Sequence, residues 1–142
     1  MENFDEILLK IVEKRNLLST LNFNDRKYDK VEDDLHDLED AFCDQFGEHM
    51  EDIISQIQNK YNPYQEVLHP TAYIARKYIV KEGESGQKLY SVTRSDGVSI
   101  ESTEKGEMRL VYIPSPSRLI LTGAHGVHEV WNVQQPEAVS TL

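Results

Sequence analysis

The chain has 142 residues, of which 39% are hydrophobic and 28% charged, so it is long enough for one hydrophobic core and short for two. With one cysteine and no run of about 18 apolar residues, the sequence excludes an intrachain disulfide and predicts no membrane span. A formal net charge of −10 argues against general nucleic-acid binding, and the lack of a secretory signal pattern favours a cytoplasmic protein.

Residues 1–62 are predicted to form an antiparallel helical hairpin. Asn3 followed by Glu6 is typical of a helix N-terminus, and apolar residues then recur every three or four positions. A second pattern of this kind runs from Tyr28 to Ile57 and must end before a proline. We therefore expect a second helix that is longer than the first, a coiled-coil-like seam between the two, and a weak point at Gly47.

The unequal lengths of the two helices leave the end of the apolar seam without a partner inside the helical hairpin. A large exposed apolar surface is unusual on a monomer. The sequence therefore predicts that this end contacts either the C-terminal lobe or the long helix of a second subunit in a homodimer. The residues concerned are Phe46, Met50, Ile53 and Ile57.

Residues 63–133 are predicted to form an antiparallel β lobe, which makes the chain an α+β protein. Short runs rich in valine, isoleucine, tyrosine and threonine are separated by turn residues, and Asp96-Gly97 predicts a tight hairpin. Short connections without helical pattern favour a meander sheet of five or six strands. Residues 134–142 are predicted to be a flexible tail. The expected strands are Tyr73–Val80, Lys88–Thr93, Val98–Glu101, Met108–Ile113, Leu119–Thr122 and Val127–Val133.

Nearly all the negative charge belongs to the helices. Residues 1–62 contain 16 acidic and 7 basic residues, whereas residues 63–142 contain 9 and 8. On a helical wheel, six carboxylates of the second helix form a line nearly opposite its apolar residues. This acidic stripe consists of Asp29, Asp33, Asp37, Asp40, Asp44 and Glu48.

The acidic stripe has two interpretations. It is either a solvated face without a partner or a surface that docks on a basic protein. Like charges four residues apart destabilise a helix by a few tenths of a kcal/mol per pair, and interspersed lysines would have served solubility equally well. Direct binding of nucleic acid is not expected, because phosphates are neutralised by Lys and Arg.

The alternative to a docking protein is a small enzyme or ligand-binding protein with a pocket in the β lobe. His125, His128 and Glu129 lie close together in sequence, and imidazole and carboxylate groups serve as metal ligands or acid-base catalysts. Tyr90 or Tyr112 would assist them. The spacing matches neither H-E-x-x-H nor H-x-x-E-H, which favours a histidine-bearing turn instead.

The sequence as a whole favours a non-catalytic interaction protein, such as an inhibitor, an immunity-type protein or an adaptor. No phosphate-binding glycine loop and no serine-nucleophile motif occurs, and Cys43 is expected to be a small buried apolar residue. We therefore predict a basic protein surface as the partner, and no cofactor, bound metal, nucleic acid or membrane.

Overall fold

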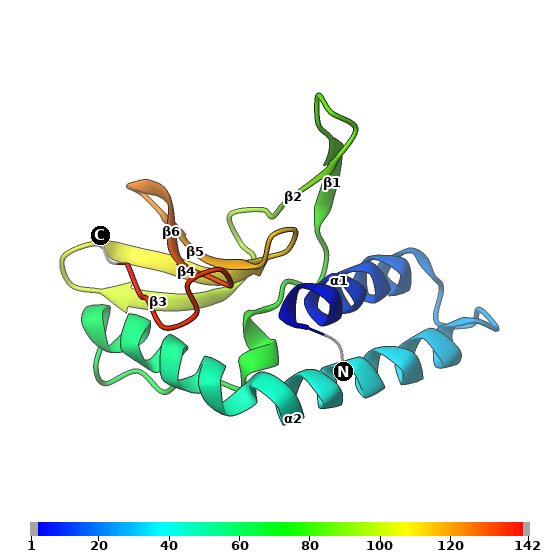
Figure 1. Cartoon of the computed structure of the whole chain (residues 1–142), viewed down its shortest axis with the longest axis horizontal. Coiled ribbons are helices and arrows are strands. Elements are labelled where there is room, and N and C mark those ends of the chain that lie inside the picture. Colours follow the sequence, from blue (N-terminus) through cyan, green and yellow to red (C-terminus); the bar gives the residue numbers. More distant parts are fainter. Residues whose placement is uncertain (1–2, 141–142) are drawn as a thin grey trace.

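The computed structural model describes residues 3–140 and confirms the α+β architecture. Helix α1 (Phe4–Thr20) and helix α2 (Tyr28–Tyr61) form the helical hairpin, and α2 runs beneath the rest of the molecule and well beyond α1 (Figure 1). Asn3 caps α1 as predicted, because its Oδ1 accepts the backbone N–H of Glu6 at 2.9 Å. No helix within residues 3–140 combines the length and apolar composition needed to cross a bilayer.

Helix α2 continues through Gly47 without a break. The glycine is buried, and a Cβ atom at this position would lie 3.8 Å from the Cβ of Cys43, an ordinary van der Waals distance. Its backbone follows the right-handed helix, where an alanine would be more favourable by about 1 kcal/mol. The weak point expected from the sequence therefore does not divide the helix.

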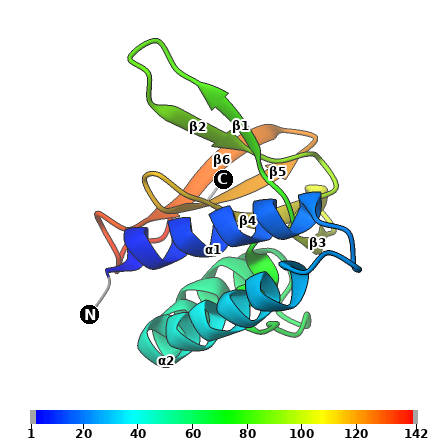
Figure 2. The same ribbon diagram turned by 90° about the vertical axis from the view of Figure 1, so that its right-hand side faces the viewer.

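The strands form two antiparallel sheets. A two-stranded sheet, the β1–β2 hairpin, stands away from a four-stranded meander with the order β3-β4-β5-β6 (Figure 2). The strands are β1 (Ile79–Glu82), β2 (Lys88–Ser91), β3 (Val98–Ser102), β4 (Gly106–Ile113), β5 (Arg118–Gly123) and β6 (Gly126–Asn132).

The hairpin predicted at Asp96-Gly97 is wrong, since β2 pairs with β1 and β3 pairs with β4. Arg109 on β4 fixes the position of this turn, because its Nη1 donates to the carbonyl of Ser95 at 3.0 Å and to that of Gly97 at 3.2 Å. A Cβ at Gly97, where φ is +95°, would lie 2.7 Å from the carbonyl oxygen of Leu110. The turn thus lies on β4 and leads the chain from one sheet into the other.

The strand predicted to begin at Tyr73 begins at Ile79 instead. Tyr73 ends a short 3-10 helix, η1 (Pro70–Tyr73), which Pro70 is suited to begin. The backbone of Tyr78 bonds to the Asn16 side chain of α1, donating to Oδ1 at 2.7 Å and accepting from Nδ2 at 3.2 Å. Bonds to a helix side chain therefore replace the strand pairing that the alternating pattern predicts.

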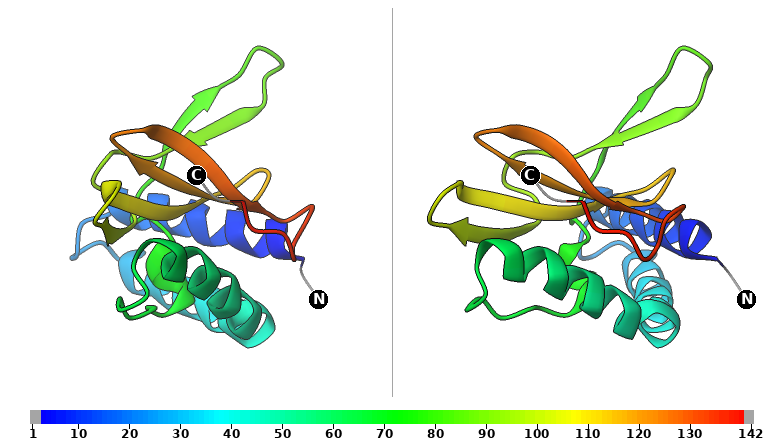
Figure 3. Two further views of the ribbon diagram at one scale, coloured as in Figure 1. Left: turned by 90° about the vertical axis from the view of Figure 1, so that its left-hand side faces the viewer. Right: turned by 60° about the vertical axis from the view of Figure 1, so that its left-hand side comes forward.

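The hydrophobic core lies between the helical hairpin and the four-stranded sheet, which lies above α2 with α1 at its side (Figure 3). Aromatic rings join the layers. Phe4 of α1 packs edge-on against Phe42 of α2 and against Trp131 of β6, with centroid distances of 5.3 Å in both pairs. Phe42 also meets Tyr112 of β4 at 6.0 Å. One core therefore includes both predicted lobes.

The end of the apolar seam on α2 is covered within the chain. Met50, Ile53 and Ile57 are at most 1% exposed and belong to the same core as the sheet residues, while half-buried Phe46 packs edge-on against Phe4 with a centroid distance of 5.1 Å. Met50, Ile53 and Ile57 thus share a core with the C-terminal lobe, one of the two contacts considered, whereas Phe46 contacts α1 inside the helical hairpin. The homodimer was predicted because this end of the seam was expected to be exposed, and in the structure it is covered.

The predicted tail makes contacts that its composition does not indicate. The carbonyl of Pro136 accepts the indole N–H of Trp131 at 2.9 Å and lies 3.1 Å from Nε2 of His49. Beyond it, the backbone N–H of Ser140 donates to the carbonyl of Val130 at 2.8 Å. The described part of the tail thus lies against both β6 and α2.

Candidate functional site

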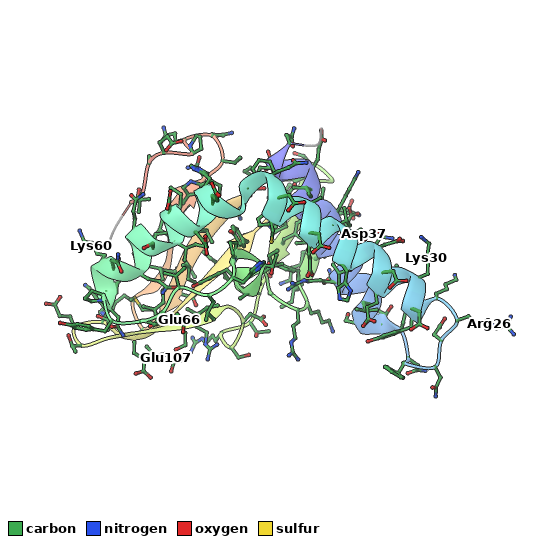
Figure 4. The ribbon with its side chains drawn as sticks, turned by 90° about the horizontal axis from the view of Figure 1, so that it is seen from below. Arg26, Lys30, Asp37, Lys60, Glu66 and Glu107 are labelled. Carbon is green, nitrogen blue, oxygen red and sulfur yellow. The ribbon has the colours of Figure 1, made fainter. Side chains whose placement is uncertain are left out.

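All six carboxylates of the acidic stripe are exposed along α2. Figure 4 shows the outer face of α2 from below, with Asp37 and Lys30 labelled and Lys30 nearer the N-terminal end of the helix. Among residues 3–140, none of the six forms a hydrogen bond or an ion pair. The stripe is thus exposed and has no direct ion-pair partner in the described chain, although Lys30, which bonds to Asp34, also feels the charges of Asp33 and Asp37.

The cations near the acidic stripe pair with other carboxylates. Lys14 and Lys30 contact Asp34 at 3.5 and 2.7 Å, and Arg15 contacts Glu39 at 3.0 Å. The hydrogen bond from Lys30 lowers the pKa of the Asp34 carboxyl, which therefore stays ionised at neutral pH. The two carboxylates that face α1 are neutralised, whereas those of the stripe are not.

Charge repulsion within the stripe opposes folding. Four pairs of stripe residues four positions apart carry like charges, and Glu48 forms a fifth such pair with Asp52, which lies outside the stripe. At a few tenths of a kcal/mol each, they destabilise α2 by about 1–2 kcal/mol at low salt. Because no contact in the described chain recovers this free energy, the stripe is not explained by folding.

The residues of the enzyme alternative do not converge. His125 is exposed in the β5–β6 turn, whereas His128 and Glu129 are neighbours on β6 and so point to opposite faces of the sheet. Nε2 of His128 lies 3.3 Å from the carbonyl oxygen of His125, and Glu129 accepts a hydrogen bond from Asn132 at 3.2 Å. The cavity beside the two histidines holds about 10 Å³, no more than one water molecule.

Replacing His125 and His128 together by alanine is expected to leave folding and partner binding unchanged. Both side chains lie at the sheet surface and hold no buried partner, and such substitutions usually change stability by no more than about 0.5 kcal/mol. The melting temperature and the affinity for a captured partner provide the measurement. A folded double variant that loses its function would favour the enzyme.

The two tyrosines considered with these histidines lie elsewhere. Tyr112 is fully buried in the core, where burial raises its pKa well above the ordinary value, and its hydroxyl has no hydrogen-bond partner among the described residues. Tyr90 lies on the β1–β2 hairpin. Across residues 3–140, no three His, Cys, Asp or Glu side chains are grouped so that they could hold a metal ion.

One pair of residues that could act as a nucleophile and its base, Cys43 and His69, is not predicted from the sequence. Sγ of Cys43 lies 3.6 Å from Nε2 of His69, and Nδ1 of His69 lies 2.9 Å from the hydroxyl of Thr71. Such a chain resembles a nucleophile, its base and an orienting group. Burial and the charges of Glu39 and Asp40 raise the pKa of the Cys43 thiol, however, so the reactive thiolate is disfavoured.

Two larger cavities lie at the surface. One, of about 630 Å³, lies between the 93–95 turn and β4, β5 and β6, with Arg94 and Arg109 in its wall. The other, of about 530 Å³, lies near the end of the helical hairpin at which residues 21–27 connect α1 to α2, beside Arg15 and Arg76. Arg15 and Arg109 already donate to backbone carbonyls, so neither cavity presents a cluster of free cations.

Comparison of the chain with protein-family models, with curated proteins and with solved structures gives no significant match. The function must therefore be inferred from the surface of this chain alone. Of the features described, the acidic stripe is the one whose charge, exposure and cost to stability all need an explanation outside the fold.

Proposed function

We propose that the protein is a non-catalytic interaction module, an inhibitor, immunity-type protein or adaptor, whose acidic stripe docks on a basic protein surface. The observation that supports this most directly is the row of six exposed carboxylates without a cation partner among residues 3–140. At about 1.5 Å per residue, the row from Asp29 to Glu48 extends over about 28 Å of one helix.

The choice of residue within the stripe supports a positional role. Five of the six acids are aspartates, although glutamate is the better helix former. The shorter aspartate side chain loses less conformational freedom when its carboxylate is held in place. Charges close to a rigid helix therefore form a fixed pattern, which suits recognition better than solubility.

Docking would be governed by electrostatics. Opposite potentials increase the rate of encounter between two proteins, and salt weakens this attraction because exposed charges are screened. Since the stripe is exposed along its length, most of the effect is expected in the association rate. The partner surface should carry Arg or Lys side chains along a groove or face of similar length.

The experiment begins with affinity capture from an extract of the source cell, eluted with a salt gradient, to obtain the partner. The test variant replaces Asp33, Asp37, Asp40 and Asp44 by asparagine. Its melting temperature should rise by a few degrees, because several like-charge pairs are removed. Its association with the partner should slow by about tenfold or more, with a weaker dependence on salt.

A control variant makes the same change in net charge on the other lobe, by replacing four exposed glutamates with glutamine: Glu82, Glu84, Glu101 and Glu104. It should bind the partner within about twofold of the wild type. If attraction depended on net charge alone, the control and the stripe variant would weaken binding equally. If the stripe variant is stabilised but binds like the wild type, the stripe is a solvated face and the proposal is refuted. A loss of stability would mean that the stripe carboxylates contribute to the fold.

A further inference from the structure

The β1–β2 hairpin is the most exposed regular element of the molecule. Every residue of its two strands is exposed except Tyr90, which is half-buried. Ile79, Val80 and Leu89 expose 42%, 43% and 50% of their surface. A two-stranded sheet is marginally stable in water by itself, so an additional strand would both stabilise it and cover these side chains.

The two sheets differ in how their edges are protected. Each outer strand of the four-stranded sheet receives a hydrogen bond from outside the sheet, because Gln65 donates to the carbonyl of Ser99 on β3 at 2.6 Å and Ser140 to that of Val130 on β6 at 2.8 Å. Within residues 3–140, no segment outside the β1–β2 hairpin donates to or accepts from the backbone of β1 or β2. Their edges are open to another strand.

The register shows which groups face outward. The N–H of Gly83 donates to the carbonyl of Gln87 at 2.7 Å, which makes this pair a hydrogen-bonded one. Bonded and non-bonded pairs alternate along antiparallel strands. The backbone N–H and C=O of Val80 on β1, and those of Lys88 on β2, therefore point away from the opposite strand and are available to a third strand.

The charge of this region is opposite to that of the chain as a whole. Residues 76–94 contain five basic residues and two acidic ones, a net charge of +3, whereas the whole chain has −10. The five basic residues are all exposed: Arg76, Lys77, Lys81, Lys88 and Arg94. Lys81 and Lys88 lie on the two strands themselves, so a strand that pairs here would place its own side chains beside one of them.

We propose that the β1–β2 hairpin binds an acidic, extended segment of a partner protein, which adds to its open edge as a third strand. Backbone hydrogen bonds to Val80 or Lys88 would supply affinity, and carboxylates beside the lysines would supply specificity. This site is independent of the acidic stripe, since Figure 1 shows the β1–β2 hairpin and α2 on opposite sides of the molecule. The protein would then join a basic partner to an acidic one.

Two other occupants are less compatible with this edge. A second copy of the chain would bring its own lysines to the same edge, and like charges across paired strands repel. Nucleic acid could meet the lysines with its phosphates, but it has no amide backbone to pair with the outward N–H and C=O groups of Val80 or Lys88. An acidic polypeptide strand satisfies both the open backbone groups and the lysines.

The probe is a fluorescein-labelled peptide of alternating glutamate and valine, about seven residues long, and its control replaces glutamate by glutamine, because a lysine peptide would also bind the acidic stripe. At low salt the full chain should bind the acidic peptide about tenfold more tightly than the neutral one. The amide of Val80 or that of Lys88 should become protected from hydrogen exchange in the complex. Equal affinity for both peptides, or protection confined to α2, would overturn the proposal.

Variants identify the edge and the role of charge. Proline removes an outward N–H without removing a bond inside the β1–β2 hairpin, so V80P or K88P should reduce peptide affinity about tenfold. The double variant K81E/K88E, which keeps both amides, should lose the preference for the acidic peptide over the glutamine control. If both proline variants bind normally, or if an oligo-dT of about ten nucleotides binds more tightly than the acidic peptide, this occupant is wrong. The stripe variant should bind the peptide within about twofold of the wild type.

Discussion

Replacing Phe42 by alanine is expected to lower the free energy of unfolding by about 3–5 kcal/mol, a large part of the 5–15 kcal/mol typical of a domain. Phe42 is 0% exposed and its ring contacts those of Phe4 and Tyr112, so its removal leaves a cavity where α1, α2 and β4 meet. Urea unfolding followed by circular dichroism and by Trp131 fluorescence measures the change.

The same experiment tests whether the helical and β parts form one cooperative unit. Because Phe42 links both parts, the helical signal and the Trp131 signal should shift together and keep coincident midpoints. The matched control is Phe23→Ala, since Phe23 is 81% exposed and its loss should change stability by no more than about 0.5 kcal/mol. Separate midpoints would show that the parts unfold independently.

Replacing Arg15 by methionine is expected to lower the free energy of unfolding by about 2–4 kcal/mol. The Arg15 guanidinium, whose side chain is 16% exposed, joins α1 to two other segments. It donates to the carbonyls of Ile74 at 2.6 Å and Ala75 at 3.2 Å, and it pairs with Glu39 on α2. Methionine keeps the apolar stem but leaves these acceptors without a donor, and thermal unfolding at neutral pH provides the measurement.

The neighbouring cation serves as the control. Lys14 contacts Asp34 at 3.5 Å with 33% of its side chain exposed, so Lys14→Met should cost no more than about 0.5 kcal/mol. Arg15→Lys keeps the charge but loses the planar fork, and it should recover only part of the loss. Equal effects of Arg15→Met and Lys14→Met would show that Arg15 acts as a surface charge and not as a link between segments.

The parts of the fold that depend on neighbours in sequence could be predicted. The spacing of apolar residues gives both helices, and the Asn3 cap gives the first turn of α1, because these features act over three or four residues. The exposure of the acidic stripe follows from the same helical geometry. This exposure could be predicted without knowing how α2 packs, because carboxylates opposite an apolar seam face water.

Features that depend on distant contacts could not be predicted. The separation into two sheets follows from Arg109, which holds the turn at Gly97 from a strand further along the chain. The pairing of Cys43 with His69 arises because the segment after α2 returns along that helix. Similarly, the edge protection provided by Gln65 comes from a loop without any strand pattern.

The acidic helix α2 and the β1–β2 hairpin, whose segment 76–94 has a net charge of +3, lie on opposite sides of the molecule, so its charge is distributed asymmetrically. A charged body approaching from solution senses this asymmetry at distances of about one Debye length, near 10 Å at moderate salt, before any side chains touch. A polycation therefore tends to turn α2 toward itself, and a polyanion turns the β1–β2 hairpin toward itself, although the net charge has one sign. The orientation of the protein in an encounter is selected during diffusion, ahead of any fit between surfaces.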